Sequence, residues 1–227
     1  MIITIDGPAG AGKSTVARRL AARLGFEFLD TGAGYRAVAL FLQQQGQAAS
    51  VNDDTLQTLL ARMHFTIQLP VYQLNGQDVT QALREPAVSE LASQMAERAS
   101  VRTYLTQWQQ AYAQGRNLVT EGRDQGTVVF PKAECKFFLT ADATIRLDRR
   151  HKELQERGSA LSKDELARLQ LERDHRDAHR ALAPLQPAPD AIVVDSTGLT
   201  IDQVVDIMEQ QVRQRASAPA PSTVTRS

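Results

Sequence analysis

This sequence has little cysteine and tryptophan and no excess of charge of either sign. Among 227 residues there is one cysteine, Cys135, so an intramolecular disulfide framework is excluded. The formal net charge is zero, which removes the overall field that draws proteins to nucleic acids or anionic membranes. No apolar run approaches the length that spans a bilayer, and no segment resembles a secretory leader. We therefore expect a cytoplasmic protein that binds neither nucleic acid nor membrane, and any anion site must be local.

Arginine, by contrast, is abundant: the sequence has 21 arginines and only 5 lysines. The planar guanidinium group grips phosphate or carboxylate through two parallel hydrogen bonds, which suits a protein with anionic ligands. A compositional bias of the genome would produce the same excess. The positions of individual arginines must therefore decide between these two explanations.

Residues 2–15, IITIDGPAGAGKST, contain the phosphate-binding signature GxxxxGK[ST]. An apolar strand pattern precedes the loop and a helical pattern over 14–24 follows it, which is the context that this motif requires. Glycines let consecutive backbone N–H groups face a phosphate, and the helix N-terminus adds partial positive charge. The signature predicts that Lys13 reaches the β- and γ-phosphates of ATP and that Ser14 faces Mg²⁺. The predicted ATP site consists of Gly7, Pro8, Ala9, Gly10, Ala11, Gly12, Lys13, Ser14 and Thr15.

A glycine-rich turn that binds nothing is the alternative interpretation of this loop. From average residue usage, the fixed positions arise by chance in roughly one chain of this length in a hundred. The requirement for a strand before the loop and a helix after it makes a chance match rarer still. The sequence therefore favours nucleotide binding.

Short apolar segments alternate with helical patterns and predict an open parallel sheet in one domain. Polar groups at the carboxyl ends of parallel strands lie on the ligand side of such a sheet. DTGAGYR follows the second strand, so Arg36 is a candidate phosphate contact, whereas Thr31 would serve equally well as a helix cap. EGRDQGT follows the third strand, where Arg123 and Asp124 contact a ligand or form a simple ion pair. The expected strands are 2–5, 26–29, 117–120, 136–139 and 191–194.

The pattern changes between residues 63 and 80, where short strands surround the hairpin signal Asn75-Gly76. We predict a small antiparallel sheet there, outside the parallel sheet. Helical patterns flank it at 52–63, 85–98 and 100–114, with Asn52 and Ser100 as expected N-caps. Ser93 and Arg102 lie in the last two helices, and the pattern alone predicts only surface positions for them.

Two charged helices, expected at 141–157 and 163–181 and joined by Gly158-Ser159, are typical of a lid. Arg149 and Arg150 on the first are candidates to reach a bound triphosphate. A face of the second helix carries Arg173, Asp177 and Arg180, although a solvated helical hairpin would show the same charge pattern. His175 and His179 lack a third ligand nearby, so we expect no metal site there. A helix at 201–213 capped by Thr200 should close the domain, and residues 214–227 should be disordered.

Taken together, residues 2–212 resemble the bacterial cytidylate kinase family of nucleoside monophosphate kinases. Two positions depart from the family pattern: Gly34 replaces a larger apolar residue, and Gln125 replaces isoleucine. Neither change removes a charged contact, so only the fine shape of the pocket is affected. The segments that carry the resemblance are GPAGAGKST, DTGAGYR, LNGQDVT, ASQMAERASVR, EGRDQGTVVFP, RDHRDAHRALAPL and DAIVVDST.

The resemblance implies an α/β P-loop NTPase fold with a five-stranded parallel sheet flanked by helices. It further implies an enlarged monophosphate-binding insertion with a small antiparallel sheet, and a helical lid. A single kinase domain would cover residues 1–213. Its parts would be a core of residues 1–36, 115–148 and 181–213, the insertion at about 37–114 and the lid at about 149–180.

The resemblance also implies a role for individual residues. Arg36, Arg123 and Arg180 would hold the acceptor phosphate. Ser93, Arg102 and Asp124 would recognise cytosine, while Arg173 and Asp177 would approach the sugar and Thr31 would complete the CMP site. The residues expected to act in transfer are Lys13, Arg123, Arg180, Arg149 and Arg150.

The expected reaction is transfer of the γ-phosphoryl group of Mg-ATP to CMP or dCMP by a monomer, as a step of pyrimidine nucleotide metabolism. A kinase of the same architecture that acts on UMP, AMP or shikimate is the nearest alternative. A GTP-dependent switch is less favoured, because Asp195-Ser-Thr-Gly198 matches DxxG but no [NT]KxD guanine-binding motif is present. A module that binds CMP without transfer would not need Lys13.

Overall fold

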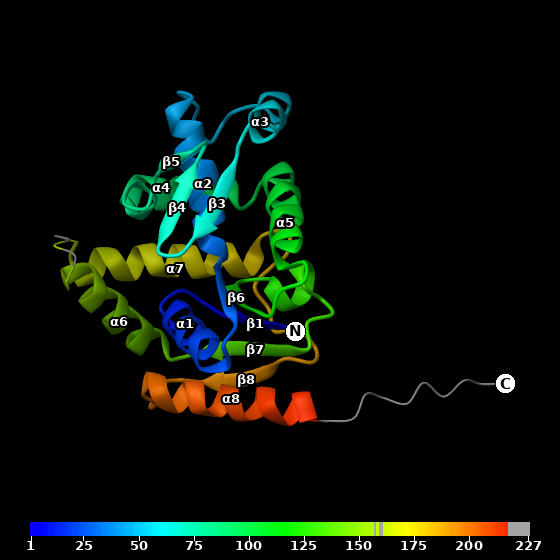
Figure 1. Ribbon diagram of the computed structural model, residues 1–227. Coiled ribbons are helices and arrows are strands. Elements are labelled where there is room, and N and C mark those ends of the chain that lie inside the picture. The colour runs from blue at the N-terminus through cyan, green and yellow to red at the C-terminus, as the bar shows by residue number, and fades with distance from the viewer. Residues whose placement is uncertain (157, 159–160, 218–227) are drawn as a thin grey trace.

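The computed structural model describes residues 1–156, 158 and 161–217 of the chain. Its central sheet has five parallel strands in the order β2-β6-β1-β7-β8 (Figure 1). Each predicted strand is confirmed, with ends that shift by no more than two residues. The strands are β1 (Ile2–Asp6), β2 (Glu27–Asp30), β6 (Leu118–Gly122), β7 (Cys135–Thr140) and β8 (Ile192–Asp195). Cys135 is fully buried in β7 as a free thiol.

The two faces of the central sheet belong to different apolar clusters, because successive side chains of a strand point to opposite faces. Phe28 and Val119 join the cluster beneath α1 (Lys13–Leu24) and α8 (Ile201–Ser217). Their neighbours Leu29 and Leu118 join the cluster formed with α2 (Thr31–Gln44) and the insertion. The sheet therefore links the nucleotide-loop side of the molecule to the insertion.

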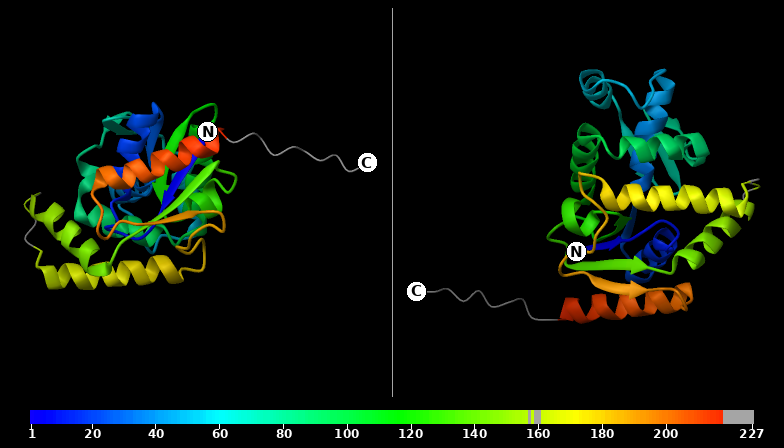
Figure 2. Two further views of the ribbon diagram at one scale, coloured as in Figure 1. Left: turned by 90° about the horizontal axis from the view of Figure 1, so that it is seen from below. Right: turned by 180° about the vertical axis from the view of Figure 1, so that it is seen from behind.

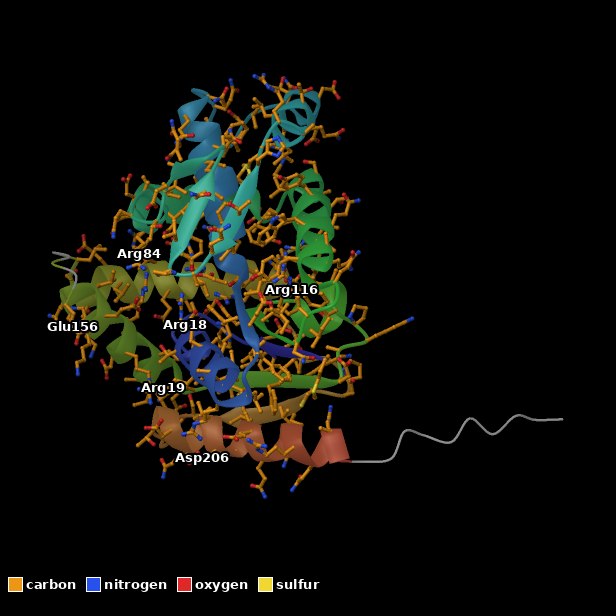
Figure 3. The ribbon with its side chains drawn as sticks, in the orientation of Figure 1. Arg18, Arg19, Arg84, Arg116, Glu156 and Asp206 are labelled. Atoms are coloured by element: carbon orange, nitrogen blue, oxygen red, sulfur yellow. The ribbon has the colours of Figure 1, made fainter. Side chains whose placement is uncertain are left out.

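Helices α1 and α8 also contact through ion pairs at the surface. Arg19 donates to Asp202 at 2.6 Å, and Arg23 pairs with Asp206; Figure 3 shows Arg19 and Asp206 on the two sides of this contact. These exposed pairs add little to stability. The apolar contacts of α1 with α8 therefore hold α1, and with it the preceding loop, on the sheet.

The predicted insertion contains a second, three-stranded antiparallel sheet, β3-β4-β5. Asn75 and Gly76 connect β4 to β5 with φ values of 49° and 82°, as the hairpin signal predicts. The elements of this region are α3 (Asp53–Leu60), β3 (Phe65–Gln68), β4 (Val71–Leu74), β5 (Gln77–Asp78), η1 (Ala82–Arg84), α4 (Pro86–Met95) and α5 (Ala99–Ala113). Figure 1 shows them above the central sheet.

The predicted cap at Ser100 is wrong, and of the two roles left open for Thr31 the helix cap is not observed. Asp30, not Thr31, caps α2, because its Oδ1 accepts from Ala33 N at 3.0 Å. Ser100 lies inside the first turn of α5, and its hydroxyl is buried without a hydrogen-bond partner. The caps at Asn52 and Thr200 are confirmed by bonds to Thr55 N at 2.9 Å and Gln203 N at 3.2 Å.

The two charged helices are α6 (Ala143–Glu156) and α7 (Lys163–His179). Figure 1 and the rear view in Figure 2 show α7 crossing between the insertion and the central sheet. Of the residues between these helices, Gly158 is described and Ser159 lies outside the described residues. Helix α8 ends at Ser217, later than the predicted 213, and residues 218–227 also lie outside the described part.

None of the helices in the described part of the chain is both long and apolar enough to cross a membrane. His175 and His179 stack on each other with ring centroids 4.2 Å apart, and His179 Nδ1 contacts His175 O at 2.9 Å. No group of three or more His, Cys, Asp and Glu side chains suited to a metal ion occurs among the described residues.

The glycine at position 34 is explained by its packing. Helix α2 runs through Gly34 without interruption, and a Cβ there would lie 3.2 Å from Leu105 Cδ2 and 3.5 Å from Trp108 Cζ3. Trp108 of α5 therefore fills the space that a larger residue at position 34 would occupy. Gln125, the second departure, is buried in the turn η2 (Gln125–Val129) and accepts from Thr120 Oγ1 at 3.0 Å.

Candidate active site

The carboxyl ends of β1, β2 and β6 lie side by side at one edge of the sheet. In the parallel register, Asp6 pairs with Gly122 and Asp30 pairs with Glu121. The phosphate-binding loop, the start of α2 and the Arg123-Asp124 pair therefore meet there. This is the edge at which ligands bind in open parallel sheets.

The loop after β1 is held by backbone contacts that only glycine permits. Gly7 has φ 150°, and a Cβ on it would lie 2.0 Å from the carbonyl oxygen of Leu139 in β7. Gly10 has φ 77°, and its Cβ would lie 2.7 Å from Arg146 O at the start of α6. The loop is therefore pressed between β7 and α6 by main-chain contacts.

Lys13 lies across this loop. Its side chain is buried, and Nζ donates to the carbonyl oxygen of Pro8 at 2.8 Å. Burial lowers the pKa of Lys13 to about 7, and the nearby Arg123 adds to the lowering while Glu121 partly opposes it. An anionic phosphate near Nζ would favour the charged form.

Ser14 and Glu121 form the part of the site that could hold a cation. Its hydroxyl donates to Glu121 Oε1 at 3.0 Å. A hydroxyl and a carboxylate are hard oxygen ligands of the kind that Mg²⁺ prefers, together with phosphate oxygens. Glu121 was not among the predicted site residues, although its position at the end of a strand would have justified it.

Predicted phosphate contacts from three elements face one another beside the loop. Arg36 of α2 pairs with Asp30 at 3.1 Å, and Arg123 Nε donates to Asp177 of α7 at 2.7 Å. Burial opposes the charge of Asp177, but Arg123, followed by Arg173 and Arg180, outweighs burial and lowers the pKa of Asp177. The acidic partners therefore let these cations approach one another.

Arg173 of α7 is exposed and lies near these residues, and it has no hydrogen bond within the described part of the chain. The surrounding protein lowers its pKa to about 10, and Arg123, Arg150 and Arg36 contribute by repulsion. Three guanidinium groups thus act on the charge of Arg173, and an anion beside it would favour the charged form.

Arg180 follows α7 and retains an unused donor. Its side chain is 6% exposed, and Nε donates to Ala183 O at 2.7 Å. Nη2 is buried without a hydrogen-bond partner, and the nearest carboxylate oxygen, from Asp124, is 4.0 Å away. Buried polar groups are usually bonded, so this donor marks a place for a ligand oxygen.

Arg102 and Asp124 form a buried ion pair next to these phosphate contacts. Arg102 Nη2 donates to Asp124, and Nη1 donates to Ala96 O at 3.1 Å. Tyr35 lies near this pair, and burial followed by the charge of Asp124 raises its pKa to about 12. The pair presents a donor and an acceptor side by side, which is the chemistry needed to read the edge of a base.

Ser93 and Thr31 already have partners in this structure. Ser93 Oγ accepts from Arg176 Nη1 of α7 at 2.7 Å, and Thr31 Oγ1 donates to the carbonyl oxygen of Glu121 at 2.7 Å. Thr31 therefore ties the start of α2 to the end of β6, at the rim of the site.

The two lid arginines differ. Arg150 pairs with Glu153 at 2.7 Å and lies near enough to Arg173 to affect its pKa. Arg149 instead donates to Ser196 Oγ at 3.0 Å and Ser196 O at 2.8 Å, after β8. The structure brings Arg150, but not Arg149, to the cluster of guanidinium groups.

Two further residues support the site and were not predicted for it. Asp6 is buried, and its carboxylate accepts from the backbone N–H groups of Gln125 at 2.9 Å and Gly126 at 2.8 Å. Burial raises the pKa of Asp6 to about 6. Arg146 donates to Ala9 O at 2.9 Å and Asp174 at 2.6 Å, so it connects the loop to α7. The sequence could have indicated Asp6, because it is a charged residue directly before the loop. No sequence pattern could have indicated the contacts of Arg146.

A separate groove of about 970 Å³ lies between α1 and β3 and contains none of the predicted site residues. Arg18 of α1 and Arg116 after α5, labelled in Figure 3, belong to its lining. Both cations already lie over aromatic rings, Arg18 over Phe28 and Arg116 over Tyr112, each at 4.6 Å from the centroid. The groove is thus distinct from the phosphate-binding edge.

Nearly the whole chain is similar to known proteins of one family. A family model described as cytidylate kinase matches residues 3–214. A cytidylate kinase of Burkholderia cenocepacia is 46% identical over 93% of this chain and 92% of its own length. One from a Thermotoga species is 42% identical over 94% of this chain and 97% of its own. An uncharacterized protein from Eubacterium ventriosum, with 12% identity, has a TM-score of 0.54 over 94% of this chain and 98% of its own, which shows the fold alone.

Proposed function

The chain belongs to the cytidylate kinase family, and we propose that it transfers the γ-phosphoryl group of ATP to CMP or dCMP, giving ADP and CDP or dCDP. One observation carries the proposal at the level of residues. Arg36, Arg123 and Arg150 lie near enough to Arg173 to repel its charge, and Arg123 and Arg173 act in the same way on Lys13 of the loop. A site that brings two phosphate groups together needs this surplus of positive charge.

Positioning and charge neutralisation are the main tasks of the protein in this reaction. The acceptor is an anionic phosphate oxygen, so no general base is required, and the γ-phosphoryl group must be placed in line with it. Lys13 and the backbone N–H groups of residues 7 and 9–15 hold the ATP phosphates. Arg36, Arg123 and Arg180 hold the acceptor phosphate, and the unbonded Nη2 of Arg180 supports that role.

Ser14 and Glu121 would hold Mg²⁺, which when bound neutralises charge on the phosphate groups. Their oxygens are 3.0 Å apart next to Lys13 and therefore fit such an ion. Among the lid arginines, Arg150 reaches the phosphates. Arg149 could act in phosphoryl transfer only after breaking its hydrogen bonds to Ser196, because both of its observed bonds go to that residue.

Base and sugar recognition involve a second group of residues. Asp124 accepts from the exocyclic amine of cytosine, Arg102 donates to the base, and Ser93 contacts it from α4. Arg173 and Asp177 approach the sugar, and Thr31 holds the adjoining end of α2. A uracil base presents a carbonyl in place of the amine, so Asp124 would disfavour UMP.

We assign the functional units by the division of the chain that the resemblance implies. The core comprises residues 1–36, 115–148 and 181–213, with the monophosphate-binding insertion at about 37–114 and the lid at about 149–180. We assign the enzyme to the cytoplasm and to the monomeric state, where every proposed contact is made within one chain.

The decisive experiment measures ADP formation from Mg-ATP by the purified full-length protein with CMP, dCMP, UMP, AMP, GMP and shikimate offered separately. We expect turnover with CMP and dCMP to exceed turnover with every other acceptor. A preference for another acceptor would replace the proposed substrate, and no turnover with any of them would refute the activity. In parallel, Lys13→Ala should lower kcat at least about 100-fold while CMP still binds. An unchanged kcat would remove Lys13 from the mechanism.

A further inference from the structure

Helix α7 contacts the insertion through Arg176, a residue that the reaction described above does not use. Its Nη1 donates to Ser93 Oγ of α4 at 2.7 Å. Two glutamates lie near the same guanidinium group. A Glu90 carboxylate oxygen is 3.7 Å from Nη1, and a Glu97 carboxylate oxygen is 3.6 Å from Nε. Among the described residues, no other side chain of α7 has a hydrogen bond or ion pair with residues 86–97.

The neighbours of Arg176 on α7 belong to the proposed substrate site. Asp177, the next residue, faces the site and pairs with Arg123. Arg173, one turn earlier, lies near enough to Arg123 for the two charges to interact. The helix that carries the sugar and phosphate contacts is therefore bonded, through Arg176, to the residue proposed to contact the base.

A serine hydroxyl has one proton and two lone pairs. A charged donor that occupies one lone pair leaves one donor and one acceptor in fixed directions, whereas an unbonded hydroxyl rotates freely. Glu90 lies 3.7 Å from the same Nη1, and Glu97 lies 3.6 Å from Nε, so two carboxylates restrain the guanidinium group. The arrangement thus fixes both the rotamer of Ser93 and the distance between α4 and α7.

We propose that Arg176 is a positioning residue for base recognition: it holds the Ser93 hydroxyl toward the base and couples α4 to α7 across the monophosphate site. The inference rests on the proposed function, because it requires that Ser93 contacts the cytosine of CMP. It assigns to Arg176 no contact with substrate and no part in the transfer step.

The test compares steady-state kinetics of full-length Arg176→Met, Arg176→Lys, Ser93→Ala and the double variant Ser93→Ala/Arg176→Met. A charge-assisted bond of this kind should make Arg176→Met raise the KM for CMP about 10-fold, with the KM for ATP changed less than 2-fold. Arg176→Lys should restore most of the affinity for CMP. The double variant should be no more than about 2-fold worse than Ser93→Ala, because both changes remove the same interaction.

Arg168→Met is the matched control, since Arg168 lies on the same helix, is exposed and, among the described residues, pairs with Glu172 alone, at 3.2 Å. It should leave both KM values unchanged. Equal rises in the KM values for CMP and ATP, additive losses in the double variant, or an unchanged KM for CMP in Arg176→Met would each overturn the inference. If the wild-type protein does not phosphorylate CMP, the proposed function itself fails, and that result is seen before any variant is measured.

Discussion

The phosphate-binding loop and the monophosphate site are adjacent but are built in opposite ways. The loop is one continuous stretch, residues 7–15, and main-chain groups of Leu139 and Arg146 press against its glycines. The proposed monophosphate site draws one or two side chains each from α2, α4, α5, the end of β6 and α7. One region depends on backbone conformation, and the other depends on the tertiary fold.

The two regions also manage charge differently. The loop offers backbone N–H groups and a helix N-terminus, which carry partial charges and need no counter-ion. The monophosphate site offers full guanidinium charges, and each of three aspartates holds one or more of them: Asp30 with Arg36, Asp124 with Arg102, and Asp177 with Arg123. A site made of like charges therefore has to include its own acids, because unpaired buried charges are costly.

Substitution of a loop glycine should have the largest effect if backbone conformation is decisive there. Gly7→Ala would place Cβ 2.0 Å from a backbone oxygen that has no flexible side chain to move. We expect kcat/KM to fall at least about 1,000-fold and the melting temperature to drop, as measured by coupled assay and calorimetry.

Gly25→Ala provides the control for Gly7→Ala. Gly25 also has a positive φ, 68°, but a Cβ there meets nothing within 4 Å. That variant should lose about 1 kcal/mol of stability and keep its kcat. Retention of more than a tenth of the activity in Gly7→Ala would show that the loop tolerates distortion.

Removal of one acid from the monophosphate site should have an intermediate effect confined to that site. Asp124→Asn preserves the shape but leaves Arg102 and Arg180 without their shared carboxylate. We expect the KM for CMP to rise about 30- to 100-fold while the KM for ATP stays within 2-fold.

Asp53→Asn removes an exposed partner of Arg98 and should change neither KM. Similar rises in the KM values for both substrates in Asp124→Asn would mean that the two regions are not independent.

Asp6 joins the two regions, because it precedes the loop and accepts from the backbone that follows Asp124. Burial raises its pKa to about 6, above the value near 3.9 expected in the unfolded chain. Between these values only the folded protein holds the proton, so the stability from Asp6 is full below pH 4 and is lost as the pH rises through 6. The free energy of unfolding should lose about 1–3 kcal/mol from this group between pH 4 and 7.

Urea unfolding of the wild type and of Asp6→Asn at several pH values measures this contribution. Their difference in unfolding free energy should change across the pH window. A difference that stays constant from pH 4 to 7 would show that Asp6 is charged throughout.

Local sequence patterns predicted most of the fold. They failed for side chains whose hydrogen-bond partners lie far away in the sequence. The Asn75-Gly76 turn and the Asn52 cap were predictable because their bonds join residues close in sequence. Thr31 was a plausible cap, but its hydroxyl bonds instead to Glu121, 90 residues away. Arg149 was equally plausible for the site, and its bonds to Ser196 could not be anticipated from a helical pattern.

The sequence by itself determined the phosphate-binding loop and the parallel sheet, and its family resemblance supplied the charged residues of the proposed site. Glycine spacing and strand periodicity act over a few residues, so they can be recognised without knowledge of the rest of the chain. Only the tertiary structure decided which aspartate holds which arginine, that Trp108 fills the space beside Gly34, and that Arg176 bonds to Ser93. Those pairings depend on distances between elements far apart in sequence, which no local pattern encodes.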